Sequence, residues 1–267
     1  MASKDSVRSD FQALLPYLIP VSAIIIWFLL CDTGLTPRYL MPHPGDVLRS
    51  GFIYIFGQSG QTQFSGRFLT DLGASLIRVG LGFSLAVILG IPLGILSGRL
   101  KPVHRMLSSS INALRAVPGI SWLPLALVWF GIGLRATVFL VALAAFFPIY
   151  LNAVTGARQV DPILYRAGAM MGVTRFRAIF TILMPSAIPH IMTGLRLGLG
   201  IAWAYLVLGE LTGVPNGLGA AIMDARMIGR TDIIFVGIIL IAVTGRICDL
   251  ILTRGLTYCF KSARRMR

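Results

Sequence analysis

The sequence predicts an all-α, polytopic membrane protein with about six transmembrane helices. Of its 267 residues, 56% are hydrophobic and 13% are charged, and the mean hydropathy is +0.81. A soluble domain typically contains about half apolar and about a quarter charged residues. At about 20 apolar residues for each helical span, the apolar stretches fit one membrane domain, residues 11–253. The expected spans cover residues 11–31, 68–98, 106–131, 137–157, 190–212 and 233–253.

The first two spans are joined by a segment that cannot continue as a membrane helix. Residues 36–45 contain three prolines and Gly45, which break a helix. Asp46 is expected to cap an amphipathic helix that lies along the outer face. In the second span, Gly90, Gly94 and Gly98 follow one another at four-residue intervals. This spacing lets another helix backbone approach closely, so we expect a helix contact there.

The third span is interrupted near its middle. Pro118, Gly119 and Pro124 lie within seven residues of one another and break the backbone hydrogen-bond ladder. At membrane depth, irregular backbone is tolerated only where protein or a water-filled cavity satisfies its polar groups. We therefore interpret this segment as lining a translocation pathway. A kink buried among helices, with no role in transport, is the alternative.

The positions of the basic residues indicate an orientation. With the N-terminus inside, fourteen basic residues face the inner side: Lys4, Arg8, Arg99, Lys101, Arg105, Arg158, Arg166, Arg175, Arg177, Arg254, Lys261, Arg264, Arg265 and Arg267. Six face the outer side: Arg38, Arg49, Arg67, Arg135, Arg226 and Arg230. This bias follows the positive-inside rule and predicts a cytoplasmic N-terminus, residues 1–10, and a basic cytoplasmic tail, residues 254–267. The net charge of +14 is then an orientation signal, and nucleic-acid binding is not expected.

The longest inner loop, residues 158–189, contains the signals of a short helix. Asp161 is a suitable N-cap, Pro162 suits the first helical position, and Gly172 supplies a left-handed stop. Such a short helix is marginal alone in water, so we expect a partner to hold it. Its apolar side chains are suited to the groove of such a partner: Leu164, Tyr165, Met170 and Met171. A second segment, capped by Thr174, is expected to end at Pro185.

This loop resembles the cytoplasmic loop of permease subunits in bacterial ABC importers. That family motif reads Glu-Ala-Ala, three residues, Gly, nine residues, then Ile-x-Leu-Pro. Four positions match in spacing: Ala167, Gly172, Ile182 and Pro185. Three differ: Arg166 replaces the glutamate, Gly168 the second alanine and Met184 the leucine. The resemblance implies a helix that docks an ATPase, with coupling residues Asp161, Leu164, Tyr165, Arg166, Ala167, Gly168, Met171, Gly172 and Pro185.

Further stretches are similar to the nitrate, sulfonate, taurine and bicarbonate branch of that family. They are residues 40–48, 117–125, 129–133 and 193–203. The resemblance implies the type I ABC importer transmembrane-domain fold in the bacterial cytoplasmic (inner) membrane. It also implies a second copy of the chain, two ATP-binding subunits and an extracytoplasmic substrate-binding protein. The transported solute would be a small anion or an organosulfur or organonitrogen compound.

ATP hydrolysis is expected on a separate chain, which would use ATP and Mg²⁺. A phosphate-binding P-loop needs Gly-Lys-Ser or Gly-Lys-Thr, and none of the three lysines follows a glycine. The three histidines lie far apart in the sequence, so we expect no metal site, and no cofactor bound by this chain. A membrane-embedded enzyme would need a polar catalytic cluster, which the sequence lacks. An ATP-independent channel or secondary transporter remains the first alternative.

Six ionisable residues fall within the expected spans: Arg78, Arg115, Arg196, Glu210, Arg246 and Asp249. A charge in lipid is costly, so each is expected to have a partner or a function. Arg246 and Asp249 are spaced to pair on one helix face, and Arg78 is expected to be structural. Arg115 and Arg196 are candidates to line an anion pathway, whereas Glu210 could serve a gate or pair with an arginine. The full set of pathway or gate candidates is Arg115, Pro118, Trp122, Arg196, Trp203 and Glu210.

Overall fold

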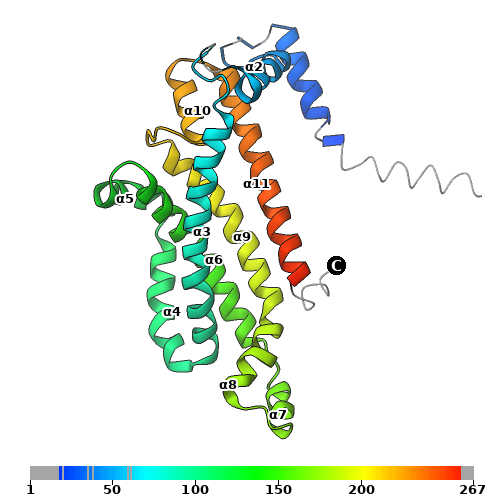
Figure 1. Ribbon diagram of the computed structural model, residues 1–267, viewed down its shortest axis with the longest axis vertical. Coiled ribbons are helices and arrows are strands. Elements are labelled where there is room, and N and C mark those ends of the chain that lie inside the picture. Colours follow the sequence, from blue (N-terminus) through cyan, green and yellow to red (C-terminus); the bar gives the residue numbers. More distant parts are fainter. Residues whose placement is uncertain are drawn as a thin grey trace, which may run out of the picture. The chain divides into compact units, whose positions relative to one another are not determined.

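The computed structural model describes residues 18–19, 21–34, 36–37, 39–58, 60 and 62–259, apart from the side chain of Cys259. Every regular element in this part of the chain is a helix (Figure 1), which confirms the predicted all-α class. The expected N-terminal segment 1–10, part of the first span and residues 260–267 of the basic tail lie outside the described residues. The described part of the first span includes a shorter apolar helix, Val21–Asp32.

Four helices in the described residues are long and apolar enough to cross a membrane. They are α3 (Phe68–Arg99), α6 (Leu134–Arg158), the continuous run Arg175–Glu210 and α11 (Thr231–Cys259). The expected third span is instead a bent pair: α4 (Lys101–Ala116) meets the segment Gly119–Phe130 at 90°. That segment contains a 3-10 turn, η1 (Gly119–Trp122), followed by α5 (Leu123–Phe130). The predicted interruption is therefore present, and it turns the chain through a right angle.

The described residues pack as two units: one contains those up to Phe68 together with Ile222–Ile238, and the other contains Leu69–Ala221 together with those from Ile239 to Cys259. The first unit contains α2 (Pro44–Phe56), which is capped by His43 and not by Asp46 as expected. The His43 ring accepts a hydrogen bond from the Gly45 amide at 3.1 Å, which leaves Asp46 in the first turn of the helix. Later in α2, Ser50 donates to Asp232 at 2.5 Å, so α2 is held to the start of α11.

In the second unit, glycines bring three helices into close contact. A Cβ added at Gly94 of α3 would lie 2.6 Å from the Cβ of Ala153 in α6, and one at Gly98 would meet Ala157 equally closely. The predicted glycine spacing is thus confirmed as a helix contact. At the neighbouring residue of α6, Asn152, the contact is with another helix. A Cβ at Gly194 of α9 (Met184–Glu210) would lie 2.7 Å from the Cβ of Asn152. Helix α6 therefore packs directly against both α3 and α9 (Figure 1).

The loop between α6 and α9 is more helical than expected. After α7 (Pro162–Met170) come α8 (Arg175–Ala178) and a π-helical turn, Ile179–Leu183, which lead directly into α9. The prediction that this segment ends at Pro185 is wrong. Pro185 lies in the first turn of α9, after the π turn, where its missing N–H removes little regular bonding. A further helix, α10 (Leu218–Met227), lies between the fifth and sixth expected spans, where no element was predicted.

Candidate functional site

Helix α7 carries its own start and stop, as the sequence predicted. The Asp161 carboxylate accepts a hydrogen bond from the Ile163 amide at 2.8 Å, and Pro162 occupies the first turn. At the other end Gly172 has φ +77°, the left-handed conformation that glycine adopts most easily. The amides of Gly172 and Val173 donate back to Ala169 and Gly168. This is the Schellman arrangement, which satisfies the carbonyl groups at the end of a helix.

One side of α7 is attached to the helical bundle. Tyr165 packs at a small core of Ala157, Val160 and Leu183, and the Arg99 guanidinium lies 4.1 Å from its ring centroid. Burial raises the pKa of the Tyr165 phenol above its ordinary value, against the smaller opposing effect of the Arg99 charge. Tyr165 therefore faces inward and is not part of the outward apolar face on which the sequence placed it.

Gly168 fixes the approach of α7 to the next segment. It is buried, and a Cβ at this position would lie 2.7 Å from the Ile182 side chain in the π turn. The second alanine of the family motif would place a methyl group at this contact. Glycine at position 168 therefore lets α7 lie closer to residues 179–183 than alanine would allow.

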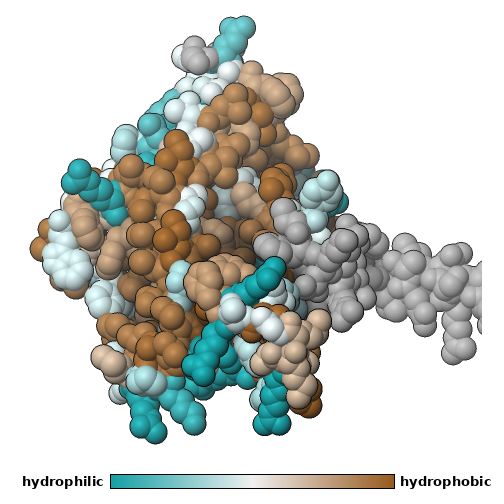
Figure 2. All heavy atoms as spheres, turned by 60° about the horizontal axis from the view of Figure 1, so that its bottom comes forward, coloured by the Kyte–Doolittle hydropathy of each residue, from teal (hydrophilic) through white to brown (hydrophobic). Residues whose placement is uncertain are grey.

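The other side of α7 exposes large apolar side chains. Met170 and Met171 are 89% and 83% exposed, Ile163 and Leu164 are also exposed, and so is Phe176 of the neighbouring α8. Arg166 and Ala167 are exposed beside them. Figure 2, in which the lower end of Figure 1 comes forward, shows apolar and hydrophilic side chains intermixed at that end. Exposed methionines form an adaptable surface of the kind that binds another protein.

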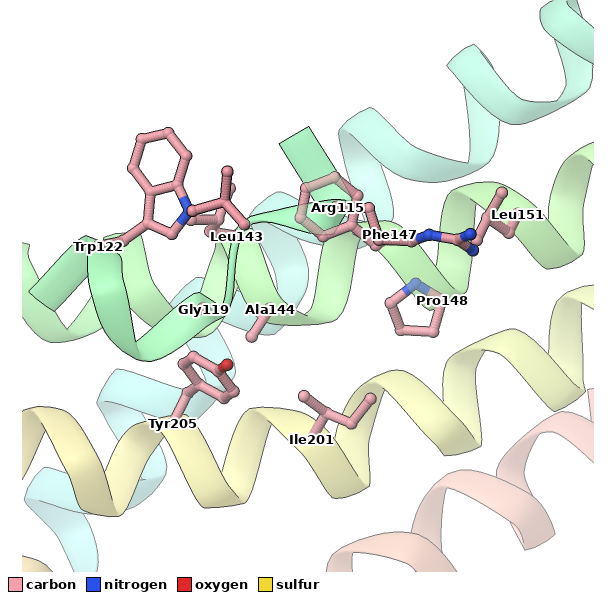
Figure 3. A pocket seen from close by; sticks show the side chains of 11 residues that line it. Arg115, Gly119, Trp122, Leu143, Ala144, Phe147, Pro148, Leu151, Ile201 and Tyr205 are labelled. Carbon is pink, nitrogen blue, oxygen red and sulfur yellow. The ribbon is translucent and has the colours of Figure 1, made fainter. Parts of the chain in front are cut away.

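The break between α4 and α5 borders a cavity of about 320 Å³. Helix α4 ends beside Arg115, and the 3-10 turn that follows Pro118 then places Gly119 and Trp122 on the cavity wall. Helices α6 and α9 complete the wall with seven residues, which are Pro148 and the following six: Leu143, Ala144, Phe147, Leu151, Ile201 and Tyr205. In Figure 3 the Arg115 guanidinium lies near Pro148 and Leu151, while the Tyr205 hydroxyl points toward Gly119 and Ala144.

Of the six pathway or gate candidates, Arg115 and Trp122 line this cavity, and Pro118 is the residue before Gly119. Arg196 instead forms an ion pair with Asp249 of α11 at 3.0 Å. Arg246 also pairs with Asp249 at 3.0 Å, which confirms the predicted pair on one helix face. Trp203 is buried in α9 and faces Gly245 of α11.

Glu210 belongs to a separate buried network. Its carboxylate accepts hydrogen bonds from Ser75 at 2.8 Å, from Arg78 at 2.7 Å and from the Gly219 amide at 2.8 Å. Arg78 also donates to the Asn216 carbonyl. Glu210 therefore pairs with an arginine, one of its two predicted roles, and holds the segment after α9 against α3.

The sequence did not identify several residues of the cavity and of this network. Tyr205 and Phe147 lie in ordinary apolar helices and have no motif around them. Gly119 has a clearer signal, because it lies between two prolines. A Cβ there would overlap the Tyr205 side chain, so only glycine lets the 3-10 turn approach α9 this closely.

Comparison with known proteins decides the family. Residues 90–254 match the family described as binding-protein-dependent transport system inner membrane component. The chain belongs to this family. Its relatives are named as transport permeases, and this chain is likewise a membrane permease with several apolar helices and not an enzyme.

Three relatives show how far the similarity extends. The permease is 36% identical over 232 residues to the putative aliphatic sulfonates transport permease protein SsuC of Bacillus subtilis, across 87% of this chain and 81% of that protein. It is 34% identical over 227 residues to the taurine transport system permease protein TauC of Escherichia coli, with 85% and 82% covered. It is 31% identical over 230 residues to the nitrate import permease protein NrtB of Synechocystis, with 85% and 82% covered.

A solved structure shares the fold. In an inward-facing conformation of the MetNI methionine ABC transporter, one chain aligns with a TM-score of 0.58 at 18% sequence identity. The alignment covers 74% of the permease and 99% of that chain. The permease therefore has the fold of a type I ABC importer transmembrane domain, as the sequence predicted.

Proposed function

We propose that this permease forms the translocation pathway of an ATP-driven ABC importer and is coupled through α7 to a separate ATPase. The solute is a small anionic or organosulfur or organonitrogen compound of the sulfonate, taurine, nitrate or bicarbonate class. The names of the three relatives support this class, since they denote sulfonate, taurine and nitrate permeases. The ATPase binds the ATP and Mg²⁺, and this chain binds no cofactor.

The observation that carries the coupling proposal is the two-sided construction of α7. Its inward side is fixed by Tyr165 and Gly168, while its outward side presents Met170 and Met171 almost fully to solvent. A helix of nine residues is too short to be stable alone. Because α7 is capped at both ends and attached on one side, it can transmit a push from a docked partner without unfolding.

The assembly contains two copies of this chain, two ATP-binding subunits and an extracytoplasmic substrate-binding protein. Both termini lie in the cytoplasm of the bacterial cell, on the same side of the inner membrane as α7. The support for this orientation is the excess of basic residues in the expected inner loops. The support for the partners is the family, whose description refers to a binding-protein-dependent transport system.

Capture of the ATPase tests the role of α7. The intact permease, in lipid nanodiscs, is mixed with the candidate ATPase and the binding affinity is measured. Met170→Asp should weaken capture by about 30-fold, because a charge at the centre of an apolar interface costs about 2 kcal/mol or more. The matched control is Met227→Asp. Met227 is 75% exposed but lies in α10, on the expected outer side, so this change should leave capture unaltered.

Two results would contradict the proposal. Equal capture by wild type and Met170→Asp would show that the ATPase docks elsewhere. Uptake into proteoliposomes that continues without any ATPase or ATP would favour the channel or secondary transporter instead.

A further inference from the structure

The arginines within the expected spans differ in whether they have a partner. Arg78 pairs with Glu210 at 2.7 Å, and both Arg196 and Arg246 pair with Asp249 at 3.0 Å. Arg115 is different: within the described residues it forms no ion pair and no hydrogen bond. It is also the arginine of this group that lines the cavity beside the helix break.

The position of Arg115 along α4 makes an unpaired charge at this residue energetically costly. Arg115 follows Lys101, at the start of α4, by fourteen residues, which is about 21 Å at 1.5 Å per residue. The apolar core of a bilayer is about 30 Å thick. If α4 enters from the inner side, Arg115 lies more than halfway across. A charge at that depth needs water or a counter-ion, and the cavity is where either can reach it.

The walls of the cavity restrict the chemistry of such a counter-ion. Most of the lining is apolar: Val117, Leu143, Ala144, Phe147, Leu151 and Ile201. The polar side chains are the Arg115 guanidinium, the Tyr205 hydroxyl and the Trp122 indole N–H, and all three can donate a hydrogen bond. Among the described residues that line the cavity there is no carboxylate. The site therefore offers one positive charge, hydrogen-bond donors and an apolar wall.

We propose that this cavity binds a singly charged organic anion with an apolar body, such as an alkanesulfonate. The anionic head binds the Arg115 guanidinium, and the aliphatic body lies against Phe147 and Leu151 of the cavity wall; Figure 3 places Leu151 beside the guanidinium. This assignment rests on the proposed function, and it narrows the solute class within it.

Other members of that class fit the cavity less well. Nitrate and bicarbonate have no apolar body, so they gain nothing from the walls and lose their water on entry. Taurine carries an ammonium group in addition to its sulfonate, and the lining offers no carboxylate to pair with it. The volume of about 320 Å³ lies within the usual range of pockets for small organic ligands.

Direct binding to the isolated permease tests the site. Trp122 lines the cavity, so its fluorescence reports occupancy, and Trp122→Phe supplies the background signal. The permease in nanodiscs of phosphatidylcholine is titrated with butane-1-sulfonate, taurine and sodium nitrate. Butane-1-sulfonate should bind at least about ten-fold more tightly than taurine or nitrate, since burial of each CH₂ contributes about 0.8 kcal/mol.

Variants at two positions, 115 and 144, test separately the binding of the anionic head and of the apolar body. Arg115→Gln should weaken the binding of butane-1-sulfonate by at least about ten-fold, because hydrogen bonds to a charged group are lost. Arg115→Lys should retain part of the affinity. Ala144→Leu fills the space beside the apolar body, so it should weaken butane-1-sulfonate binding while leaving the weak binding of nitrate unchanged.

The matched control is Arg246→Gln, which removes an arginine that has a carboxylate partner and lies outside the cavity. This change should leave binding within about two-fold of wild type. The site assignment is refuted if Arg115→Gln binds butane-1-sulfonate as tightly as wild type does. It is equally refuted if nitrate binds as tightly as butane-1-sulfonate.

The same variants distinguish this inference from the proposed function. Arg115→Gln should still capture the ATPase through α7, because the cavity and α7 share no lining residue. If the permease captures the ATPase but its binding of butane-1-sulfonate does not depend on Arg115, the proposed function stands and the assignment of the binding site is refuted. If the permease binds butane-1-sulfonate through Arg115 but never couples to an ATPase, the assignment of the binding site stands and the proposed function is refuted.

Discussion

Replacing Glu210 by Gln should loosen the segment that follows α9. Glu210 is fully buried, and its carboxylate accepts from Ser75, Arg78 and the Gly219 amide. Glutamine preserves the shape of the side chain but removes its charge. Arg78, which is also buried, would then lose the carboxylate that its guanidinium contacts at 2.7 Å.

The expected cost follows from the burial of both partners. Breaking a buried ion pair by removing one charge typically costs about 3–5 kcal/mol. Ser75 and the Gly219 amide can still bond to the glutamine side chain, so we take the lower end, about 3 kcal/mol. At about 1.4 kcal/mol for each factor of ten, this corresponds to roughly a 150-fold increase in local opening.

Hydrogen exchange measures this opening directly. The amides of Gly217, Leu218 and Gly219 donate to Asp71, Ser75 and Glu210 and should be protected in the wild type. In Glu210→Gln their exchange should be faster by roughly 150-fold. The control is Asp224→Asn, which breaks the half-exposed Arg67–Asp224 pair, with 3.2 Å between its nitrogen and oxygen. Partly exposed pairs contribute about 1 kcal/mol or less, so exchange at these three amides should not change.

A double variant separates the ion pair from the rest of the network. Arg78→Gln combined with Glu210→Gln should cost less than the sum of the single changes, because the Arg78 charge that loses its partner is removed as well. The reasoning is refuted if Glu210→Gln leaves exchange within about two-fold of wild type. Strict additivity of the two changes would refute the direct coupling of Arg78 and Glu210.

Two further predictions concern glycines. Gly94→Val should destabilise the detergent-purified permease by about 2 kcal/mol, seen as a lower midpoint of thermal unfolding, because the added Cβ would lie 2.6 Å from that of Ala153. Gly80→Val, with no atom within 4 Å of the added Cβ, is its control, and equal midpoints for the two variants would contradict close packing of α3 on α6. Gly172→Ala should cost about 1 kcal/mol through its φ of +77° alone and speed exchange of the Val173 amide, with Gly172→Asn intermediate. Identical exchange in wild type and both Gly172 variants would contradict a left-handed stop.

The ends of α7 could be predicted from the sequence because capping acts over a few residues. Asp161, Pro162 and Gly172 each satisfy a requirement of the backbone next to them, so tertiary structure is not needed to interpret them. The same argument was wrong at α2, where two residues near the helix start can cap it. His43 takes the cap, and Asp46 is left in the first turn.

The charge pairs show where such local reasoning ends. Arg246 and Asp249 lie three residues apart on one helix, so helical geometry alone predicts their contact. Arg78 and Glu210 are separated by 132 residues. Periodicity gives the buried face of each helix but not which helix it meets, so the sequence left Glu210 with two roles. For the same reason it did not predict that Asp249 of another helix pairs with Arg196, one of the pathway candidates.

The cavity could be predicted only in part. Pro118, Gly119 and Pro124 predict a break in the third span, because such residues disrupt the backbone hydrogen bonds of a helix wherever they occur. The opposite wall comes from α6 and α9, through residues such as Phe147 and Tyr205 that are typical of any apolar helix. Only the packing of these helices brings Phe147 and Tyr205 to the break.

The continuous run Arg175–Glu210 connects the end of the molecule that holds α7 to the buried network of Glu210. It contains 36 residues, about 54 Å at 1.5 Å per residue, which exceeds the roughly 30 Å core of a bilayer. Gly194 and Gly198 hold it against α6 at contact distance, so it cannot shift sideways alone. Its regular bonding is interrupted at the π turn 179–183, next to α7, and bending is therefore easiest there. Gly168 of α7 lies directly against Ile182 of this turn, so α7 contacts the run at the place where it bends most easily.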